Sequence, residues 1–421
     1  MTQRIAVATL APPMSTSGAV PAKTVCCIVG GGPAGMMLGF LLARAGQHVI
    51  VLEKHKDFFR DFRGDTIHPA TLDLMYELGL LDEFLAVPHN QITAMSIAIG
   101  GESLPMADFS HVPTHAKFIA LMPQWDFLNF LAAQAVKFPT FQLLIEHEVT
   151  GLIEDRNNRV IGVHANTPSG PIDIPATLVV GCDGRQSISR VSAHLPIHET
   201  KAFIDVLWFH LSRHKDDPEN VLGNINYGSL LVLINRDTYF QCGFIIAKDT
   251  FTTKIQPAGL PAFHESLVRL VPSLSDRVQE ITSWDQVKLL SVQVNRLTRW
   301  HRPGLLCIGD AAHAMSPVGG IGINLAIQDA VAAARILAPA LATGFVSELT
   351  LAHVQSRRAL PTRITQTFQV MAHFFLGKVF RNPGPIKPPL ILRFLSSRPG
   401  FRRLLARFVG IGVRPEHIRN H

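Results

Sequence analysis

The chain has 421 residues with a formal net charge of +7, and 47% of its residues are hydrophobic while 17% are charged. This length predicts two domains, or one large α/β unit with an insertion. No uninterrupted apolar stretch reaches about 18 residues, which excludes a membrane-spanning segment by composition. The five cysteines are scattered and odd in number, so a disulfide framework is excluded and a reducing cytoplasm is favoured.

Residues 1–23 precede the first clear structural pattern. They hold a weak apolar run and several prolines, without the apolar core and small-residue cleavage site of a signal peptide. We expect a disordered leader here.

The first motif lies at residues 24–53, which read TVCCIVGGGPAGMMLGFLLARAGQHVIVLE. An apolar run ends in glycines, apolar residues then recur at helical spacing as far as Gly46, and a second apolar run ends at Glu53. This pattern predicts a βαβ unit whose glycines stand in GxGxxG register, namely Gly30, Gly32 and Gly35.

The residue type at each position of this motif has a structural reason. In order, the three glycines make a tight turn, admit a pyrophosphate and let the helix lie against the strand. Pro33 suits the first helical turn, where its missing N–H removes no hydrogen bond. A phosphate would lie at the helix N-terminus, and Glu53 would accept a hydrogen bond from a ribose 2′-hydroxyl while repelling a 2′-phosphate. We therefore expect a dinucleotide of the FAD or NAD type, with Ala34 and Lys54 as further contacts.

Two later apolar runs each end in an acidic turn. Residues 178–190, LVVGCDGRQSISR, place Asp183 after a strand, and residues 305–310, LLCIGD, place Gly309 and Asp310 after another. An Asx turn explains either alone. The stretch GDAAHAMSPVGGIGINLAIQDA (309–330) has four glycines within fourteen residues, although a glycine inside a helix costs about 1 kcal/mol relative to alanine. The glycines indicate that the main chain must come close to another group there, where side chains would not fit.

Together these segments resemble the group A flavoprotein monooxygenases, the family with the p-hydroxybenzoate hydroxylase fold. GGGPAG is similar to the nucleotide fingerprint of that family, CDGRQSISR to its DG motif and the 309–330 stretch to its GD motif. FRGDTIHPATLDLMYELGL (62–80) is similar to its Arg-bearing segment, with Arg63 in that role, and Gln124 lies where the family often has a flavin-contacting Gln. The resemblance covers residues 24 to 335 in the right order.

The resemblance implies an α/β fold with a Rossmann-like FAD-binding domain, an interleaved β-sheet substrate domain and a C-terminal helical tail. It places the FAD-binding domain at 24–90, 116–200 and 285–365, the β-rich substrate domain at 91–115 and 201–284, and a basic helical tail at 366–421. Within the substrate domain, residues 95–110 predict a hairpin that turns near Gly100 and Gly101.

The resemblance also implies roles for the glycine-rich stretch. Asp310 would hydrogen-bond the ribityl chain of FAD, and Pro317 would lie against the isoalloxazine ring. The following helix N-terminus would approach the ring edge and stabilise negative charge on the reduced flavin. In addition to Asp183 of the DG motif, the resemblance implies cofactor contacts in this stretch at Gly309, Asp310, Pro317, Gly320, Gly322, Ile323 and Asn324.

The implied reaction is a hydroxylation. NADPH or NADH would reduce FAD, O₂ would add to give a C4a-hydroperoxyflavin, and one oxygen would enter an aromatic or other electron-rich, apolar small molecule. Because no second dinucleotide fingerprint occurs downstream, the nicotinamide would bind without its own Rossmann domain. No catalytic base is assigned: His210, Tyr227, Tyr239 and Asp205 each fit an ordinary strand position, and His313 is expected to support the GD loop.

Other functions stay open. A flavin-dependent halogenase is disfavoured because its WxWxIP segment is absent, whereas an isoprenoid or lipid reductase of similar flavin fold and a flavin-bound redox sensor without turnover are not excluded. A metal site is not expected, because prolines interrupt the two His pairs at helical spacing, His111/His115 and His194/His198, and no HExxH or CxxC occurs.

The basic charge is concentrated in the tail. From Met371 to His421 there are ten Lys or Arg residues and one acid, Glu416. In PGFRRLLARFV, Phe401, Leu404, Leu405 and Phe408 form one helical stripe, and arginines take the other side. This helix either docks on its own protein or binds anionic lipid as a peripheral contact. Nucleic acid is not expected, because no aromatic-interleaved basic motif accompanies the charge.

Overall fold

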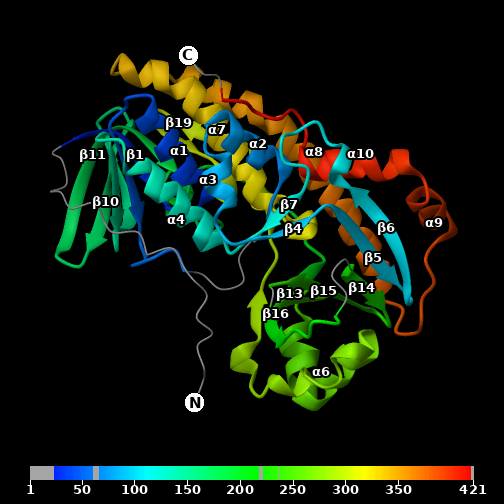
Figure 1. The fold of residues 1–421 in the computed structure, drawn as a ribbon. Helices are drawn as coiled ribbons and strands as arrows, with labels where there is room; N and C mark the ends of the chain where they lie inside the picture. Colours follow the sequence, from blue (N-terminus) through cyan, green and yellow to red (C-terminus); the bar gives the residue numbers. More distant parts are fainter. Residues whose placement is uncertain (1–22, 60–65, 218–220, 237, 419–421) are drawn as a thin grey trace.

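The computed structural model describes residues 23–59, 66–217, 221–236 and 238–418 (Figure 1). Residues 1–22 of the expected leader and the predicted cofactor contact Arg63 lie outside the described residues. The predicted fold class is confirmed: two large sheets are joined by shorter elements, and helices run along the C-terminal part of the chain.

The larger sheet has eight strands and contains the predicted βαβ unit. That unit consists of β1 (Thr24–Val29), α1 (Pro33–Arg44) and β2 (Val49–Glu53), with β1 parallel to β2. The strand order is β19 (His301–Arg302), β20 (Leu305–Cys307), β11 (Gly170–Gly181), β1, β2 and β8 (Phe141–Ile145). Antiparallel strands β9 (Glu148–Glu154) and β10 (Val160–Thr167) extend it from β11.

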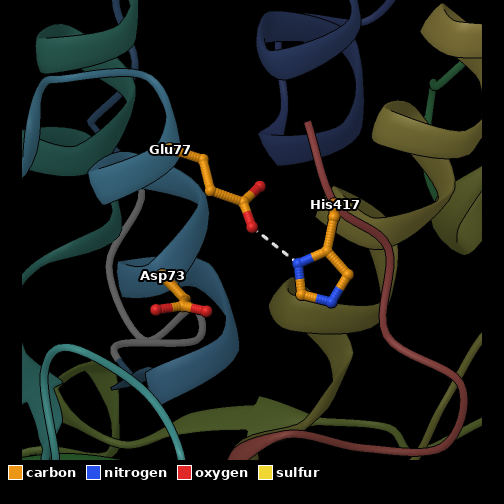
Figure 2. A group of neighbouring side chains, drawn as sticks. All are labelled: Asp73, Glu77 and His417. Atoms are coloured by element: carbon orange, nitrogen blue, oxygen red, sulfur yellow. Dashed lines mark hydrogen bonds and ion pairs between the residues drawn. The ribbon is translucent and has the colours of Figure 1, made fainter. Parts of the chain in front are cut away.

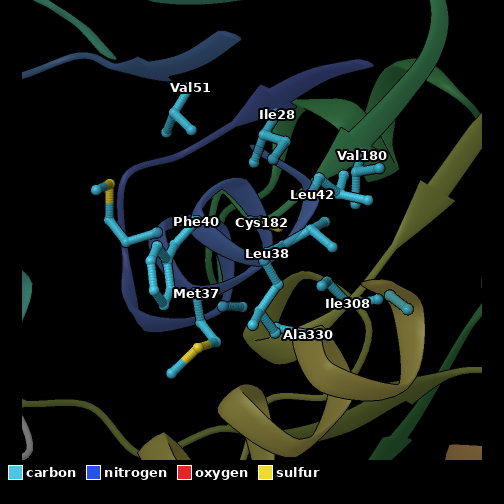
Figure 3. Packing of buried hydrophobic residues seen from close by; sticks show 14 of the residues in the cluster. Ile28, Met37, Leu38, Phe40, Leu42, Val51, Val180, Cys182, Ile308 and Ala330 are labelled. Carbon is cyan, nitrogen blue, oxygen red and sulfur yellow. The ribbon is translucent and has the colours of Figure 1, made fainter. Parts of the chain in front are cut away.

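Helices bury this sheet. α4 (Gln124–Ala135) and α7 (Gly322–Ala342) both contact α1, and α8 (Glu348–Phe380) packs on α7. Figure 3 shows part of the resulting core, with Ile28 and Val180 from the strands beside Leu38 and Leu42 from α1. The parallel strands read as continuous apolar runs in the sequence because helices cover the sheet.

The smaller sheet has seven strands. Their order is β17 (Lys288–Leu290), β13 (Ile204–Ser212), β16 (Tyr239–Ala247), β15 (Ser229–Asn235), β14 (Val221–Asn226), β5 (Ala94–Ile99) and β6 (Glu102–Asp108). The predicted hairpin is present, since β5 and β6 turn at Gly100 and Gly101, both with positive φ. β17 belongs to this sheet because its backbone pairs with β13.

The two faces of the smaller sheet have different partners. One face packs on α6 (Gln256–Leu270), where Phe263 meets Phe209 and Phe244 edge-on. The other face packs against Leu376 and Val379 of α8 and against Val318, which lies just before α7. This second face therefore borders the glycine-rich stretch.

Short elements connect the large sheets. Three strands form a small sheet, namely β3 (Thr66–Ile67), β7 (Ile119–Leu121) and β4 (Asn90–Ile92). β12 (Ile197–Thr200) pairs with β18 (Val294–Leu297). The short helices among these elements are α2 (Pro69–Glu77), α3 (Leu81–Leu85) and α5 (Ile188–Ser192).

The tail ends in two helices, α9 (Leu390–Ser396) and α10 (Pro399–Gly410). α10 docks on the protein: Ala406 and Val409 are buried, and the Phe408 ring lies 4.8 Å from the Phe368 ring of α8. The expected apolar stripe is partly wrong, because Leu404 is 67% exposed. The end of α10 packs so closely on Phe109 that a Cβ at Gly410 would lie 3.1 Å from that ring, which turns Ala406 and Val409 inward.

One helix of the described part is long and apolar enough to cross a membrane, at Val318–Ala342. It is a core helix, since 67% of its apolar window is buried inside the protein.

Candidate functional site

The glycine loop after β1 is shaped for close backbone approach. Gly30 has a φ of 103°, and a Cβ there would lie 2.6 Å from the Cys182 carbonyl oxygen, while a Cβ at Gly35 would collide with the Gly30 carbonyl. These positions therefore require glycine. Gly32 precedes α1, and no atom of the described residues lies within 4 Å of where its Cβ would be. The N-terminus of α1 thus faces open space, as an anion site needs.

Glu53 lies beside this loop at the end of β2. Its Oε2 accepts a hydrogen bond from Gly31 N at 3.0 Å, and its Oε1 accepts one from His55 N at 3.1 Å. The carboxylate is therefore held at the loop where the ribose is expected. Lys54 is exposed and its Nζ lies 3.9 Å from Glu148, so the structure gives it a loose surface ion pair.

The DG and GD turns lie side by side and share an ion pair. Arg185 of the DG turn donates from Nε to Asp310 Oδ2 at 3.3 Å, and the Asp310 side chain is 35% exposed. Asp183 accepts from Ser187 Oγ at 2.5 Å and from Ser189 N at 2.9 Å, which fixes the start of α5. Its predicted contact with the cofactor stays a prediction.

A buried network of charged side chains supports the GD turn. Asp329 of α7 is fully buried and accepts from Gly309 N at 3.1 Å, His313 Nε2 at 2.5 Å and Arg358 Nε at 2.9 Å. Burial alone raises the pKa of Asp329, but His313 and Arg358 reverse this, so the pKa lies below its usual value. His313 therefore supports the loop, as expected, and Arg358 extends the network to Glu416 at 3.4 Å.

Asn324 ties the start of α7 to the segment before α2. Its Oδ1 accepts from His68 N at 2.9 Å and Thr71 Oγ1 at 2.7 Å, and its Nδ2 donates to Thr66 O at 3.2 Å. Thr66 in turn donates from Oγ1 to Gly320 O at 3.0 Å. The Asn324 side chain is thus used within the protein, which leaves backbone groups for the predicted flavin contact.

The backbone at the N-terminus of α7 is open. Gly322 begins the helix, and no described atom lies within 4 Å of where its Cβ would be. The first N–H groups of a helix, here those of Gly322 and Ile323, have no partner inside the helix, and the helix dipole is positive at this end. This arrangement suits the negatively charged edge of a reduced flavin. Ala34 of α1 lies close to the GD turn, since a Cβ added at Gly309 would be 3.1 Å from the Cβ of Ala34.

Helix α8 holds the segment around Pro317. Gln369 Nε2 donates to Ser316 O at 2.8 Å and to Val318 O at 3.1 Å, while its Oε1 accepts from Ser316 N at 3.2 Å. His373 Nε2 lies 2.7 Å from Ser316 Oγ, and burial lowers the pKa of His373 to about 4, so the ring is neutral. Both side chains are fully buried. Neither residue was predicted from the sequence, where they appear only as two polar residues four positions apart.

The other candidates have structural contacts. Gln124 begins α4 and is half-buried. Asp205 is buried, pairs with Lys248 Nζ at 2.8 Å and accepts from Val292 N at 2.9 Å. His210 and Tyr239 meet edge-on with ring centroids 5.0 Å apart. These contacts assign no catalytic base.

Three side chains with metal-ligating atoms gather between α2 and the tail, Asp73, Glu77 and His417 (Figure 2). Glu77 accepts from His417 Nδ1 and from Ile418 N, each at 2.6 Å. Asp73 accepts from His115 Nδ1 at 2.7 Å. These hydrogen bonds hold the end of the described chain against α2.

The three motif turns lie at one edge of the larger sheet. The glycine loop, the DG turn and the GD turn follow β1, β11 and β20, which are neighbouring parallel strands, so their carboxyl ends meet. The open N-termini of α1 and α7, the carboxylate of Glu53 and the half-exposed Asp310 fit a phosphate, a ribose and a flavin ring. Fold and site together define an FAD-dependent oxidoreductase with the p-hydroxybenzoate hydroxylase fold.

Comparison with known proteins gives the particular family. Residues 23–367 match the family described as an FAD binding domain. The 6-methylpretetramide 4-monooxygenase of Streptomyces rimosus is 31% identical over 388 residues, which cover 92% of each chain. The chain therefore belongs to the FAD-dependent aromatic monooxygenases and is an enzyme that uses FAD, with NAD(P)H as the reductant typical of the family. A Rhodococcus hoagii rifampicin monooxygenase is 26% identical over 332 residues, and the match covers 61% of its length.

Solved structures show the same fold. The OxyS anhydrotetracycline hydroxylase of Streptomyces rimosus aligns with a TM-score of 0.74 and 21% identity, covering 95% of this chain and 78% of the other. The p-nitrophenol 4-monooxygenase PnpA of Pseudomonas putida aligns with a TM-score of 0.70 and 19% identity, covering 89% and 97%.

Proposed function

We propose that the protein hydroxylates a polycyclic aromatic compound of the tetracycline type, with FAD, with NADPH or NADH as reductant and with O₂ as oxidant. The observation that carries the proposal is the meeting of the three motif turns at one sheet edge, in a chain 31% identical along nearly its full length to a 6-methylpretetramide monooxygenase. Anhydrotetracycline appears in the names of further relatives, and an aromatic ring system is the chemistry that these names share.

The residues at the site have distinct proposed tasks. Bound FAD, once reduced, supplies an electrophilic oxygen atom derived from O₂. The free N–H groups at Gly32 and Gly322 bind the pyrophosphate and stabilise negative charge on the ring, and Glu53 accepts from the ribose. Gln369 and His373 position the backbone on both sides of Pro317. Arg63 and Gln124 complete the proposed cofactor contacts.

The substrate chamber lies, in this proposal, between the glycine-rich stretch and the smaller sheet. The bordering face carries Val206, Trp208 and Val232, and Val318 packs against the same cluster. Apolar walls suit an aromatic ligand and exclude water, which would otherwise release the activated oxygen as hydrogen peroxide. Residues 24–90, 116–200 and 285–365 would then bind FAD, and residues 91–115 and 201–284 would cover the substrate. We place the enzyme in the cytoplasm, with a peripheral membrane contact through its tail.

The test begins with the purified protein. We expect a yellow FAD spectrum, and NAD(P)H consumption that rises when 6-methylpretetramide or anhydrotetracycline is added. With ¹⁸O₂, the product gains one labelled oxygen. The proposal would be contradicted, and a redox sensor supported, if the amount of hydrogen peroxide formed equalled the amount of NAD(P)H consumed with every aromatic compound added. Turnover of the acceptor without O₂ would support the reductase alternative.

A pair of glycine variants gives the control. Gly35→Val places side-chain atoms against the Gly30 carbonyl, so FAD binding and hydroxylation should both be lost. Gly377→Ala, in α8, has no described atom within 4 Å of the new Cβ apart from the backbone of its own helix, so both should be retained. Retention of FAD by Gly35→Val would contradict the proposed binding mode.

A further inference from the structure

The tail has an apolar surface that the described residues leave uncovered. On α9, Leu390 is 79% exposed, Ile391 is 70% exposed and Phe394 is 56% exposed, and on neighbouring α10 Leu404 is 67% exposed. We call these four residues the α9 face. The opposite side of α9 is docked, since Ser396 is buried and Leu392 packs against the cluster of the smaller sheet. In Figure 1, α9 lies at the outer edge of the molecule.

Basic residues precede and follow α9 in the chain. Residues 349–415 contain twelve Lys or Arg and neither Asp nor Glu. Lys387 comes just before α9, and the Arg398 guanidinium lies 4.5 Å from the centroid of the Phe394 ring. Arg393 pairs with Glu102 of β6, with Nε 2.8 Å from Oε1, which holds α9 against the smaller sheet. Exposed apolar side chains and the basic groups of Lys387 and Arg398 therefore occur together.

We propose that the α9 face docks on an anionic membrane surface, with Leu390, Ile391 and Phe394 entering the boundary of the acyl chains and Lys387 and Arg398 contacting lipid headgroups. This deepens the peripheral contact of the proposed function and rests on it, but it assigns the contact to α9, because α10 is docked on the protein. Apolar residues flanked by cations are what an interfacial anchor requires.

Charge decides between the possible occupants of this face. A second copy would use the same surface on both partners, since two-fold interfaces are self-complementary. Two surfaces that each carry Lys387 and Arg398, and on which Arg393 already pairs with Glu102, would then meet. Like charges at an interface are unfavourable. An anionic bilayer complements the charge and the apolar residues at once. An aromatic, apolar substrate also partitions into lipid, so membrane docking would bring the enzyme to it.

The full-length protein with bound FAD is mixed with phosphatidylcholine vesicles, with or without about one third phosphatidylglycerol, and the bound fraction is measured by sedimentation. We expect binding to the anionic vesicles to be at least about tenfold tighter, and to weaken in high salt. The double variant Ile391→Ser/Phe394→Ser should bind at least about tenfold more weakly, because each removes a large apolar group. Lys387→Gln and Arg398→Gln should each weaken binding about fivefold.

Leu349→Ser is the matched control, because Leu349 is 82% exposed on the first turn of α8 beside Glu348, outside the α9 face. Its vesicle binding should equal that of the unchanged protein. All variants should keep their circular dichroism and their hydroxylation of dissolved substrate.

Three results would overturn the proposal: equal binding to neutral and anionic vesicles, no binding to either, or unchanged binding of the double variant. A dimer in solution that the double variant dissociates would assign the face to a second copy and also overturn it. Vesicle binding without hydroxylation would leave the docking surface intact and count against the proposed function instead.

Discussion

Gln369→Leu tests whether α8 positions the segment around Pro317, which we propose faces the flavin. The substitution keeps the volume of the side chain but removes three hydrogen bonds, two donated to Ser316 O and Val318 O and one accepted from Ser316 N. At about 1 kcal/mol net for each bond, the free energy of unfolding should fall by about 3 kcal/mol. If half of this free energy is also lost from FAD binding, because the segment around Pro317 is misplaced, the Kd for FAD should rise about tenfold. A larger share of NAD(P)H should also end as hydrogen peroxide.

The same helix offers a matched control. Gln355 Oε1 accepts from Trp300 N at 3.0 Å and its Nε2 donates to Thr298 O at 2.9 Å, so it holds a different loop in the same manner. Gln355→Leu should lower the free energy of unfolding by about 2 kcal/mol in urea titrations and leave the Kd for FAD and the peroxide yield unchanged. If Gln369→Leu also changed stability alone, the positioning role would be refuted.

Three further outcomes are expected. Gly320→Ala places a Cβ against Thr66 at a φ of 64°, so the free energy of unfolding should fall by at least about 1–2 kcal/mol and FAD should be lost during gel filtration. Asp329→Asn leaves Arg358 buried beside a neutral partner and should destabilise the protein by about 3–5 kcal/mol in urea; a change below 1 kcal/mol, on the order of a surface pair, would contradict the network. Burial lowers the pKa of His68 and of His373 to about 4, so the folded state binds fewer protons than the unfolded state between pH 6.5 and 4. The free energy of unfolding should therefore be highest above pH 6.5 and fall by up to about 2.7 kcal/mol per pH unit below it, whereas a flat profile between pH 7 and 5 would rule this out.

The motif turns were predictable because their chemistry is local. GxGxxG before a helix, with Glu53 at the next strand end, specifies a turn, an anion site and a hydrogen-bond acceptor by spacing alone. The order of the motifs then gave the fold class through resemblance.

The supports of those turns were not predictable in the same way. Asn324, a predicted cofactor contact, also has a support role that spacing could not show, since its side chain bonds His68 and Thr71, which lie more than 250 positions earlier. Gln369 and His373 look like the polar face of an ordinary helix until tertiary packing buries them. Helix α10 was placed correctly, but its buried side was wrong for Leu404, because close packing at Gly410 sets the rotation of the helix.

The buried link from Asp329 through Arg358 to Glu416 has a consequence for how the protein can be divided. The matched family region ends at residue 367, before Gln369, His373 and Glu416. A fragment cut at that boundary would keep all the recognisable motifs, yet it would lose Glu416, the partner of Arg358, and the two side chains that bond Ser316. Any minimal version of this enzyme must therefore include the rest of α8 and the tail as far as Glu416.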